Sequence, residues 1–399
     1  MNSGPLKGMT VIDLSNMIAG GTTTSHLADF GARVIKVERP DIGDPIRAWG
    51  PFKDGESIWW NVLSRNKESI TLNLTTTQGQ EILKKLIAEA DILVESFRAH
   101  TLEKWGLDYK TLSNINRSII VVHISGYGQT GPYSDRPGFG SIAEAMSGFV
   151  NANGFPDQSP ILPPMPLADE LAGTFAAMSI LMATYELNKG NSGMGQEIDV
   201  SLYEPLFRLL IPNVSQFDQL GILVSRLGNR FPDGAPRNLY ISQDGKWIAL
   251  SANTQGVWEQ LAKAIGREDL IIDPRFTTNS QRVTNVEHLD AIIQGWFSSK
   301  TISEILDILN RAGAVVFPIY NTDQIMEDPQ YNARGNIVDV PHEILGNIKM
   351  PSPIPIMSRT PGSVHRPGPI LGGDNINVYQ EFLGISETDI TDWKEKGII

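Results

Sequence analysis

The first half of the chain alternates short apolar runs with segments of helical periodicity. Continuous apolar runs rich in β-branched residues predict strands, at residues 9–15, 32–38, 69–74, 91–96, 118–125 and 196–202. The segments between them predict helices at residues 22–30, 77–89, 141–150 and 168–187, and from about Tyr203 onward. Buried strands that alternate with helices indicate a parallel sheet covered on both faces. The predicted fold class is therefore α/β, doubly wound, with a Rossmann-like large domain.

The clearest helical pattern lies in residues 168–187. Leu171, Phe175, Met178, Met182 and Tyr185 follow one another at spacings of four and three residues. This spacing places them on one face of a helix, so they are expected to form its buried stripe. Upstream, two adjacent glycines at positions 20 and 21 predict a turn before the helix at 22–30.

The pattern changes near Leu227. Residues 228–237 form a turn-rich linker, and residues 239–251 predict a hairpin around Asp244-Gly245. Helices are expected at about 254–266, 286–297 and 302–312, followed by a strand at 314–320. Residues 228–325 are therefore predicted to be a small α+β domain inserted into a large domain of residues 1–227 and 326–399. The proline-rich stretch after residue 326 is expected to return as an extended segment.

Composition excludes several classes of function. The chain contains no cysteine, which excludes disulfides, cysteine-ligated metals and thiol catalysis, and it leads us to expect a cytoplasmic protein. Its net charge of -12 argues against a nucleic-acid partner. The longest apolar candidate, residues 172–187, is shorter than a membrane span and no signal-peptide pattern is visible, so no membrane partner is expected. The six histidines have no metal-ligand spacing, and no metal site is predicted.

A glycine motif follows the strand at 118–125. The sequence GYGQTG, residues 126–131, matches G-x-G-x-x-G, but Pro132 and further loop residues follow where a dinucleotide site needs a helix. We therefore interpret it as a glycine-rich loop. Neither a phosphate-binding P-loop nor a G-x-S-x-G nucleophile motif occurs.

Asp169 begins the helix predicted at 168–187. A carboxylate at a helix N-terminus commonly satisfies free backbone N–H groups, and spacing alone favours this interpretation. The functional alternative is that Asp169 stays ionised and attacks a carbonyl group. Basic and aromatic residues also follow the predicted strands, where α/β sheets bind ligands, which suggests a phosphorylated ligand with a flat ring; ordinary surface charge is the alternative. These residues are Lys36, Arg39, Arg47, Arg65, Lys67, Arg98 and Lys104, with Trp49, Trp59, Trp60, Phe97 and Trp105 among them.

Several ordered blocks carry a family resemblance. They include LKGMTVIDLSNMIAGG, GARVIKVERPDIGDPIR, ADILVESFRAHTLEKWGLDY, SGYGQTGPYSDRPGF, ADELAGTFAA and HRPGPILGGDN. The chain resembles the family III CoA-transferases, which include formyl-CoA, carnitine and benzylsuccinate CoA-transferases. The resemblance implies that Asp169 is the catalytic aspartate, which forms a mixed anhydride and then an aspartyl-CoA thioester. It implies acyl-CoA and a carboxylic acid as substrates and no tightly bound cofactor, and the glycine-rich loop 126–140 is a candidate source of oxyanion donors.

The same resemblance implies contacts with coenzyme A. The matching positions are Arg39, Leu72, Ser96, Phe97, Lys104 and Arg136. Lys104 stands where the family often has Arg, and Ser96 where it usually has Asn. Ile18 replaces a Gln of formyl-CoA transferase, Gly140 replaces the family's usual acid, and residues 229–237 lack a tetraglycine loop. These departures favour a larger or less polar acyl group, aromatic or dicarboxylic, over formyl-CoA and oxalate.

Quaternary structure and two alternative functions also follow from the resemblance. It implies two interlocked rings, either a homodimer or a heteromer with a related subunit. An α-methylacyl-CoA racemase shares the implied fold, but it needs a proton-shuttling His where this chain has Phe139. The third interpretation is a non-catalytic subunit of a heteromeric transferase, against which the retained Asp169 argues.

Overall fold

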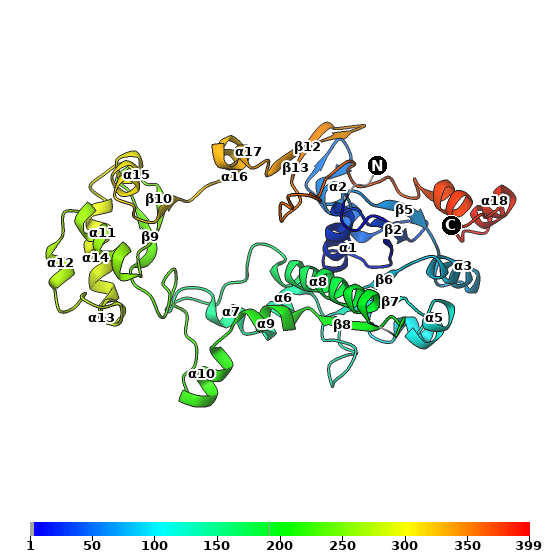
Figure 1. Ribbon diagram of the computed structural model, residues 1–399, viewed down its shortest axis with the longest axis horizontal. Coiled ribbons are helices and arrows are strands. Elements are labelled where there is room, and N and C mark those ends of the chain that lie inside the picture. The colour runs from blue at the N-terminus through cyan, green and yellow to red at the C-terminus, as the bar shows by residue number, and fades with distance from the viewer. Residues whose placement is uncertain (1–3, 191) are drawn as a thin grey trace. The chain divides into compact units, whose positions relative to one another are not determined.

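The computed structural model describes residues 4–190 and 192–399, and the chain divides into two compact units (Figure 1). The larger unit comprises Met1–Phe149, Leu162–Pro212 and Pro329–Ile399, and the smaller comprises Val150–Ile161 and Asn213–Asp328. The smaller unit thus takes in more of the chain than the expected residues 228–325. Hydrogen bonds tie the added segments together, from Gly228 N–H to the Gly154 carbonyl at 2.9 Å and from Arg226 Nε to the Phe155 carbonyl at 3.2 Å.

The larger unit is built on a six-stranded sheet in the order β5-β2-β1-β6-β7-β8. All five neighbouring pairs are parallel, which confirms the predicted α/β class and parallel sheet. The strands are β1 (Thr10–Asp13), β2 (Arg33–Glu38), β5 (Glu68–Thr71), β6 (Ile92–Glu95), β7 (Ile120–Ser125) and β8 (Glu197–Ser201).

Successive strand residues pack into two different cores, as both faces of this sheet are covered. Ile12 and Leu93 belong to one core, and their neighbours Val11 and Ile92 belong to the other. The first core is covered by α3 (Thr77–Ala88), α5 (Tyr109–Ile115), the π-helical segment Asn377–Phe382 and α18 (Glu387–Glu395). The second is covered by α1 (Ala19–Asp29), α6 (Gly140–Met146), α8 (Leu167–Lys189) and α9 (Tyr203–Leu209).

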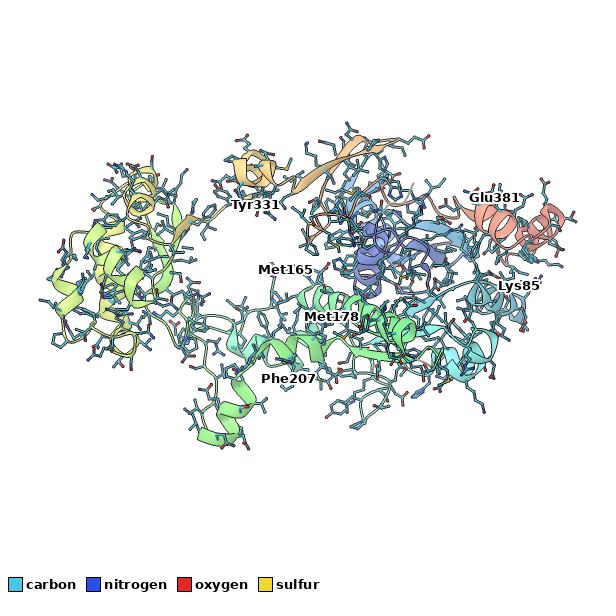
Figure 2. All side chains as sticks on the ribbon, in the orientation of Figure 1. Lys85, Met165, Met178, Phe207, Tyr331 and Glu381 are labelled. Carbon is cyan, nitrogen blue, oxygen red and sulfur yellow. The ribbon has the colours of Figure 1, made fainter. Side chains whose placement is uncertain are left out.

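Helix α8 buries a different face from the one expected. Its buried residues are Ala168, Ala172, Gly173, Ala176, Ala177, Ile180 and Ala183. Met178, Met182 and Tyr185 are instead exposed by 42%, 60% and 67% (Figure 2 shows Met178). Close packing against α1 explains the difference, because a Cβ at Gly173 would lie 2.5 Å from the Ala19 carbonyl oxygen. Small residues are needed where two helices approach this closely, so the larger apolar residues face outward.

Helix α1 begins earlier than predicted and contains both Gly20 and Gly21. A Cβ at Gly21 would lie 2.9 Å from Leu63 Cδ2, and one at Gly20 would overlap the Ser15 side chain. These glycines therefore permit close contacts within a helix rather than forming the predicted turn. By length and composition α8 could also cross a membrane, and it is the only such helix in the described residues; its small-residue face packs as the core helix of a globular domain does.

Shorter elements complete the larger unit. They are the 3-10 helix Pro45–Ala48, β3 (Phe52–Lys53), β4 (Glu56–Ser57), α2 (Ile58–Leu63), α4 (Thr101–Lys104), α17 (Pro329–Ala333), β12 (Ile337–His342) and β13 (Gly346–Pro351). Helix α7 (Phe149–Ala152) begins at the last residue of the first segment of the larger unit and continues into the smaller unit. The C-terminal segment is less extended than predicted, because it contains the β12–β13 hairpin and α18. It is attached to the sheet by Tyr379, whose hydroxyl donates to the Thr71 carbonyl at 2.7 Å.

The smaller unit has the predicted α+β character. Its antiparallel sheet has the order β11-β10-β9, and its core contains Trp258, Phe276, Leu289 and Phe297. The elements are α10 (Asn213–Leu220), β9 (Arg237–Ile241), β10 (Trp247–Ser251), α11 (Gln255–Ala264), α12 (Asp269–Ile272), α13 (Asn279–Thr284), α14 (Val286–Phe297), α15 (Ile302–Arg311), β11 (Val316–Pro318) and α16 (Thr322–Glu327).

Candidate active site

The strand order places a ligand crevice between β1 and β6. From β1 the chain proceeds outward through β2 to β5, and then returns to the other side of β1 with β6, β7 and β8. Parallel α/β sheets bind ligands at the carboxyl ends of the strands where the order reverses in this way. The residues that follow β1 and β6 are Leu14–Met17 and Ser96–Arg98, so these segments border the crevice.

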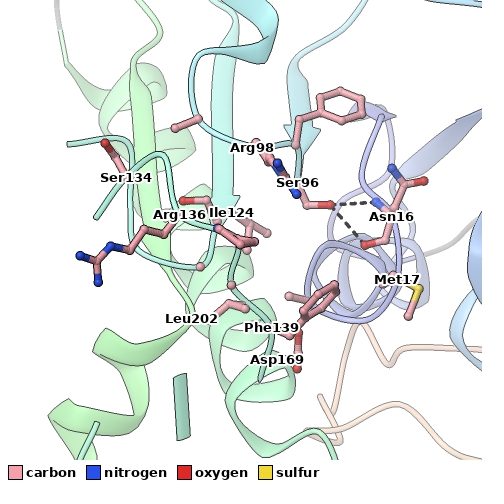
Figure 3. Close-up of a pocket in the computed structure, with 17 residues that line it drawn as sticks. Asn16, Met17, Ser96, Arg98, Ile124, Ser134, Arg136, Phe139, Asp169 and Leu202 are labelled. Carbon is pink, nitrogen blue, oxygen red and sulfur yellow. Dashed lines mark hydrogen bonds between the residues drawn. The ribbon is translucent and has the colours of Figure 1, made fainter. Parts of the chain in front are cut away.

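A cavity of about 260 Å³ lies at this crevice (Figure 3). Its lining combines apolar side chains with two arginines, several small polar residues and one carboxylate, that of Asp169. The lining residues are Asn16, Met17, Ala19, Ser96, Phe97, Arg98, Ala99, Ile124, Ser125, Gly126, Ser134, Arg136, Pro137, Gly138, Phe139, Asp169 and Leu202. The cavity therefore joins the carboxyl ends of four strands, β1, β6, β7 and β8, to the first turn of α8.

Asp169 lies in the first turn of α8, as predicted, but it is not the N-cap. Pro166 occupies that position and makes no side-chain capping hydrogen bond. Instead, Glu144 on α6 accepts the Ala168 N–H at 3.3 Å. Gly140 on the same helix lies directly against Asp169, because a Cβ there would overlap Asp169 Oδ2 and lie 3.1 Å from Asp169 Cγ.

The electrostatic surroundings of Asp169 work against its ionisation. Burial, followed by the negative charges of Glu144 and Glu170, raises the pKa of Asp169 to about 6. The helix N-terminus alone predicts a shift in the opposite direction, so the two neighbouring acids and desolvation outweigh it. At neutral pH the carboxylate is still mostly ionised, and it is more basic, hence more nucleophilic, than an ordinary aspartate.

Three of the residues implied for CoA lie in this cavity with Asp169. Ser96 Oγ accepts the Asn16 N–H at 2.8 Å and donates to the Asn16 carbonyl at 3.2 Å, which joins the two strand ends (Figure 3). Phe97 packs edge-to-face on Trp105, with ring centroids 5.3 Å apart. The Arg136 guanidinium lies 3.8 Å from the Tyr133 ring centroid. Within the described residues neither Arg136 nor Arg98 forms an ion pair, so both remain available to an anionic ligand.

The other three implied CoA residues lie outside the cavity. Arg39 follows β2 and is exposed, and Lys104 is exposed at the end of α4. The Leu72 side chain is only 1% exposed and belongs to the core against which Phe97 packs. Leu72 is not among the residues that line this cavity, and its contact with the adenine ring of CoA stays a prediction.

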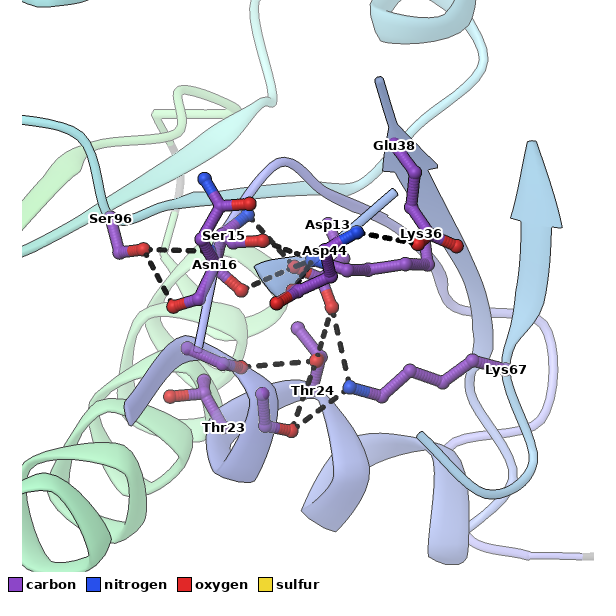
Figure 4. A network of polar contacts seen from close by, with 12 residues as sticks. Asp13, Ser15, Asn16, Thr23, Thr24, Lys36, Glu38, Asp44, Lys67 and Ser96 are labelled. Carbon is purple, nitrogen blue, oxygen red and sulfur yellow. Dashed lines mark hydrogen bonds and ion pairs between the residues drawn. The ribbon is translucent and has the colours of Figure 1, made fainter. Parts of the chain in front are cut away.

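A buried ionic network holds the turn after β1 (Figure 4). Asp13 is fully buried between Lys36, 3.6 Å away, and Lys67, 3.3 Å away. Burial raises the pKa of Asp13, but these two lysines and its hydrogen bonds more than offset burial and hold it below the usual value. Lys36 also pairs with Asp44 at 3.0 Å.

The network reaches the cavity through the backbone of residues 15–17. Asp13 accepts the Ser15 N–H at 2.9 Å, Lys36 donates to the Ser15 carbonyl, and Asp44 accepts the Met17 N–H at 3.2 Å. Met17 has a φ of 64°, a strained conformation that these contacts sustain. The network thus fixes the cavity wall formed by Asn16 and Met17.

Sequence reasoning missed Asn16, Met17 and Glu144 as site residues. Asn16 and Met17 directly follow the first predicted strand, so the rule for strand carboxyl ends could have identified them. Glu144 gave no comparable signal, since its role depends on the packing of α6 against α8. No group of three His, Asp or Glu side chains in residues 4–190 and 192–399 is arranged to hold a metal ion.

The chain matches the family model described as CoA-transferase family III over residues 6–375. Succinyl-CoA–D-citramalate CoA-transferase of Chloroflexus aurantiacus is 39% identical over 396 residues, covering 99% of this chain and 98% of that protein. The beta subunit of succinyl-CoA–L-malate CoA-transferase of the same organism is 37% identical over 399 residues, covering 99% and 98%. The crystal structure of a CaiB/BaiF family protein from Brucella suis has a TM-score of 0.84 and 31% identity, covering 95% of this chain and 99% of that chain.

Proposed function

This chain belongs to CoA-transferase family III and is a CoA-transferase that acts on acyl-CoA and carboxylic acids, and we propose that it carries the acyl group and then CoA on Asp169. One observation carries this proposal. Asp169 is the only carboxylate that lines the cavity of about 260 Å³, among the residues that the structure describes. Its raised pKa of about 6 makes it a basic carboxylate that is still ionised at neutral pH.

The reaction divides into balanced acyl transfers. Asp169 Oδ attacks the thioester carbon, the C–S bond breaks, and a mixed anhydride and CoA thiolate form. The thiolate attacks the aspartyl carbonyl, which releases the donor acid and leaves an aspartyl-CoA thioester. The acceptor carboxylate then attacks the aspartyl carbonyl and expels the thiolate. Attack of the thiolate on the acceptor carbonyl gives the new acyl-CoA and restores Asp169.

The walls of the cavity suit the remaining parts of the substrates. Phe97 is proposed to contact the adenine ring, and Arg136 and Ser96 to contact the phosphates or pantetheine of CoA. Arg39 and Lys104 are proposed as outer contacts of the nucleotide on the exposed surface. Glycine-rich backbone at Gly126 and Gly138 lines the same cavity, and we propose that this loop supplies N–H donors to the oxyanion.

We propose a dicarboxylic acid as the acceptor and succinyl-CoA as the donor. The two relatives described above are named for succinyl-CoA and for D-citramalate or L-malate, both of which are 2-hydroxy dicarboxylates. The chain offers Arg98 and Arg136 at the cavity, neither with an ion-pair partner in the described residues. A second carboxylate on the substrate is the kind of group that an arginine recognises.

A panel of acids tests the proposed substrates. The protein is incubated with succinyl-CoA and either L-malate, D-citramalate, or a monocarboxylic or aromatic acid of similar size, and the new thioesters are identified by mass. We expect transfer to the dicarboxylates at least about tenfold faster than to the others. Faster transfer to an aromatic acid would overturn the proposed acceptor class. Racemisation has no support from the cavity, because the phenyl ring of Phe139 cannot move a proton.

We also propose that the chain works as an assembly with a second copy or a related subunit, arranged as interlocked rings. Large apolar side chains on α8 and α9 are exposed, among them Met182, Tyr185 and Phe207 (Figure 2 shows Phe207). Such patches on a soluble protein commonly mark an interface. Light scattering of the purified chain is expected to give twice its 43.9 kDa mass; a monomer that gains mass only with a related subunit would favour the heteromer.

A further inference from the structure

Helix α6 presents two residues to the start of α8, Gly140 and Glu144, which are one turn apart and therefore on the same face. Gly140 leaves the space that the Asp169 carboxylate occupies, since a Cβ at position 140 would overlap Asp169 Oδ2. Glu144 accepts the N–H of Ala168, the residue before Asp169, at 3.3 Å. Both contacts therefore help to determine where the Asp169 carboxylate lies.

Glu144 is an unusual residue to find in this place. Its side chain is only 3% exposed, and within the described residues no Lys, Arg or His forms an ion pair with it. A buried carboxylate without a cation costs free energy. The amide of a Gln could accept the same N–H without that cost, so the hydrogen bond alone does not explain the charge.

Several elements around Asp169 carry charged or titratable groups, and among the described residues Glu144 and Glu170 are the two acids that act on its pKa. Glu144 projects from α6 and Glu170 from α8 itself, and Glu170 accepts a hydrogen bond from Thr22 of α1 at 3.2 Å. On α1, His26 Nε2 lies 3.4 Å from the hydroxyl Oγ1 of Thr174, one turn after Glu170 on α8. On α9, Glu204 accepts a hydrogen bond from Ser201, and Arg98 and Arg136 line the cavity. Of the two acids that raise the pKa of Asp169, Glu144 has the larger effect.

We propose that Glu144 is a positioning residue for Asp169: it holds the first turn of α8 through Ala168, and its charge favours the acylated Asp169 side chain over the free carboxylate. This inference rests on the proposed function, in which Asp169 is the nucleophile. When Asp169 Oδ bonds to the thioester carbon and the C–S bond breaks, the negative charge leaves Asp169 with the CoA thiolate. Repulsion between two adjacent carboxylates is thereby relieved, and the relief stabilises the covalent intermediate relative to the resting enzyme.

Glu144→Gln tests the charge while keeping an acceptor for Ala168. In the variant we expect the acid limb of kcat/KM to move down by about one pH unit from about 6. We also expect several-fold less Asp169 to be trapped by hydroxylamine during turnover, with the affinity for free CoA unchanged. Glu186→Gln, an exposed acid near the other end of α8, is the matched control and should change neither quantity.

A second variant separates the effect of the Glu144 charge from the effect of its side-chain length. Glu144→Asp keeps the charge but shortens the side chain, so it should keep the acid limb near pH 6 while lowering kcat. An unchanged acid limb and trapped fraction in Glu144→Gln, or an equal shift in Glu144→Asp, would overturn the role of Glu144. Either result leaves the proposed function intact if Asp169→Asn is inactive, whereas an active Asp169→Asn would overturn the proposed function itself.

Discussion

Gly140 and Asp169 lie in direct contact across the packing of α6 against α8, and the Asp169 carboxylate occupies the space that a side chain at position 140 would fill. The absence of a side chain at position 140 of α6 therefore makes room for the carboxylate carried by α8. The contact involves the end of a side chain, so a substitution at position 140 displaces the carboxylate rather than the backbone.

Gly140→Ala should consequently reduce transfer without unfolding the protein. A displacement of the nucleophile by about 1 Å commonly costs about 100-fold in rate, and we expect a loss of kcat of this order. Affinity for CoA should change little. Gly256→Ala is the control, because no atom lies within 4 Å of a Cβ at that helical position, and it should leave kcat intact. Steady-state kinetics and calorimetric CoA binding check the prediction, which an unchanged kcat in Gly140→Ala would contradict.

Asp169→Asn should abolish transfer and also stabilise the fold at neutral pH. The folded pKa of Asp169 is raised from 3.8 to about 6, so its ionisation destabilises the native state progressively between these values and fully above pH 6. The shift corresponds to about 3 kcal/mol at most, which partial exposure reduces to about 1 to 2 kcal/mol. Urea unfolding should show this gain at pH 7.5 and none near pH 3.5. If the variant were less stable than wild type at pH 7.5, ionisation of Asp169 would not destabilise the native state.

Transfer by the wild-type protein should fall as the pH drops through about 6. Only the ionised Asp169 carboxylate attacks a thioester, and its pKa is about 6 because of burial, Glu144 and Glu170. The prediction is checked by kcat/KM between pH 4.5 and 8.5, since this ratio reports groups of the free enzyme. An acid limb near pH 4, where an ordinary aspartate titrates, would mean that the neighbouring charges do not act on the nucleophile.

Lys67→Met should destabilise the larger unit strongly. Lys67 is fully buried beside Asp13, 3.3 Å away, and also donates to the Gly21 carbonyl at 3.0 Å. Its removal weakens the compensation of a buried carboxylate, which typically costs about 3 to 5 kcal/mol. Lys84→Met, which removes an exposed pair with Glu81, should cost less than about 1 kcal/mol. Comparable unfolding midpoints for the two variants would argue against the network as a support of the cavity wall.

The pattern of apolar runs predicted the sheet well but assigned the faces of α8 wrongly. Periodicity shows which residues share a helix face, and Met178, Met182 and Tyr185 do share one. It does not show whether large or small residues pack inward. That choice depends on how closely α1 approaches at Gly173, a tertiary property that one sequence does not contain. The two glycines of α1 were misread for the same reason.

The candidate site, like the fold, was predicted only in part from the sequence. The place of Asp169 at a helix start followed from the sequence pattern, and strand ends indicated where Phe97 lies, whereas Ser96 and the catalytic role of Asp169 came from the family resemblance. The direction of the pKa shift of Asp169 did not follow, because Glu144 approaches from a separate helix. Leu72 was expected near the adenine ring of CoA; its side chain is buried and does not line the cavity, and burial of this kind depends on tertiary packing.

Trapping of the covalent intermediate tests the central claim most directly. The protein is mixed with succinyl-CoA and either quenched within the first turnover or treated with hydroxylamine. It is then digested, and the mass of the peptide that contains Asp169 is measured. The account predicts an acyl or CoA adduct, or the derived hydroxamate, on Asp169 only when acyl-CoA is present. An unmodified Asp169 peptide during full turnover would contradict it.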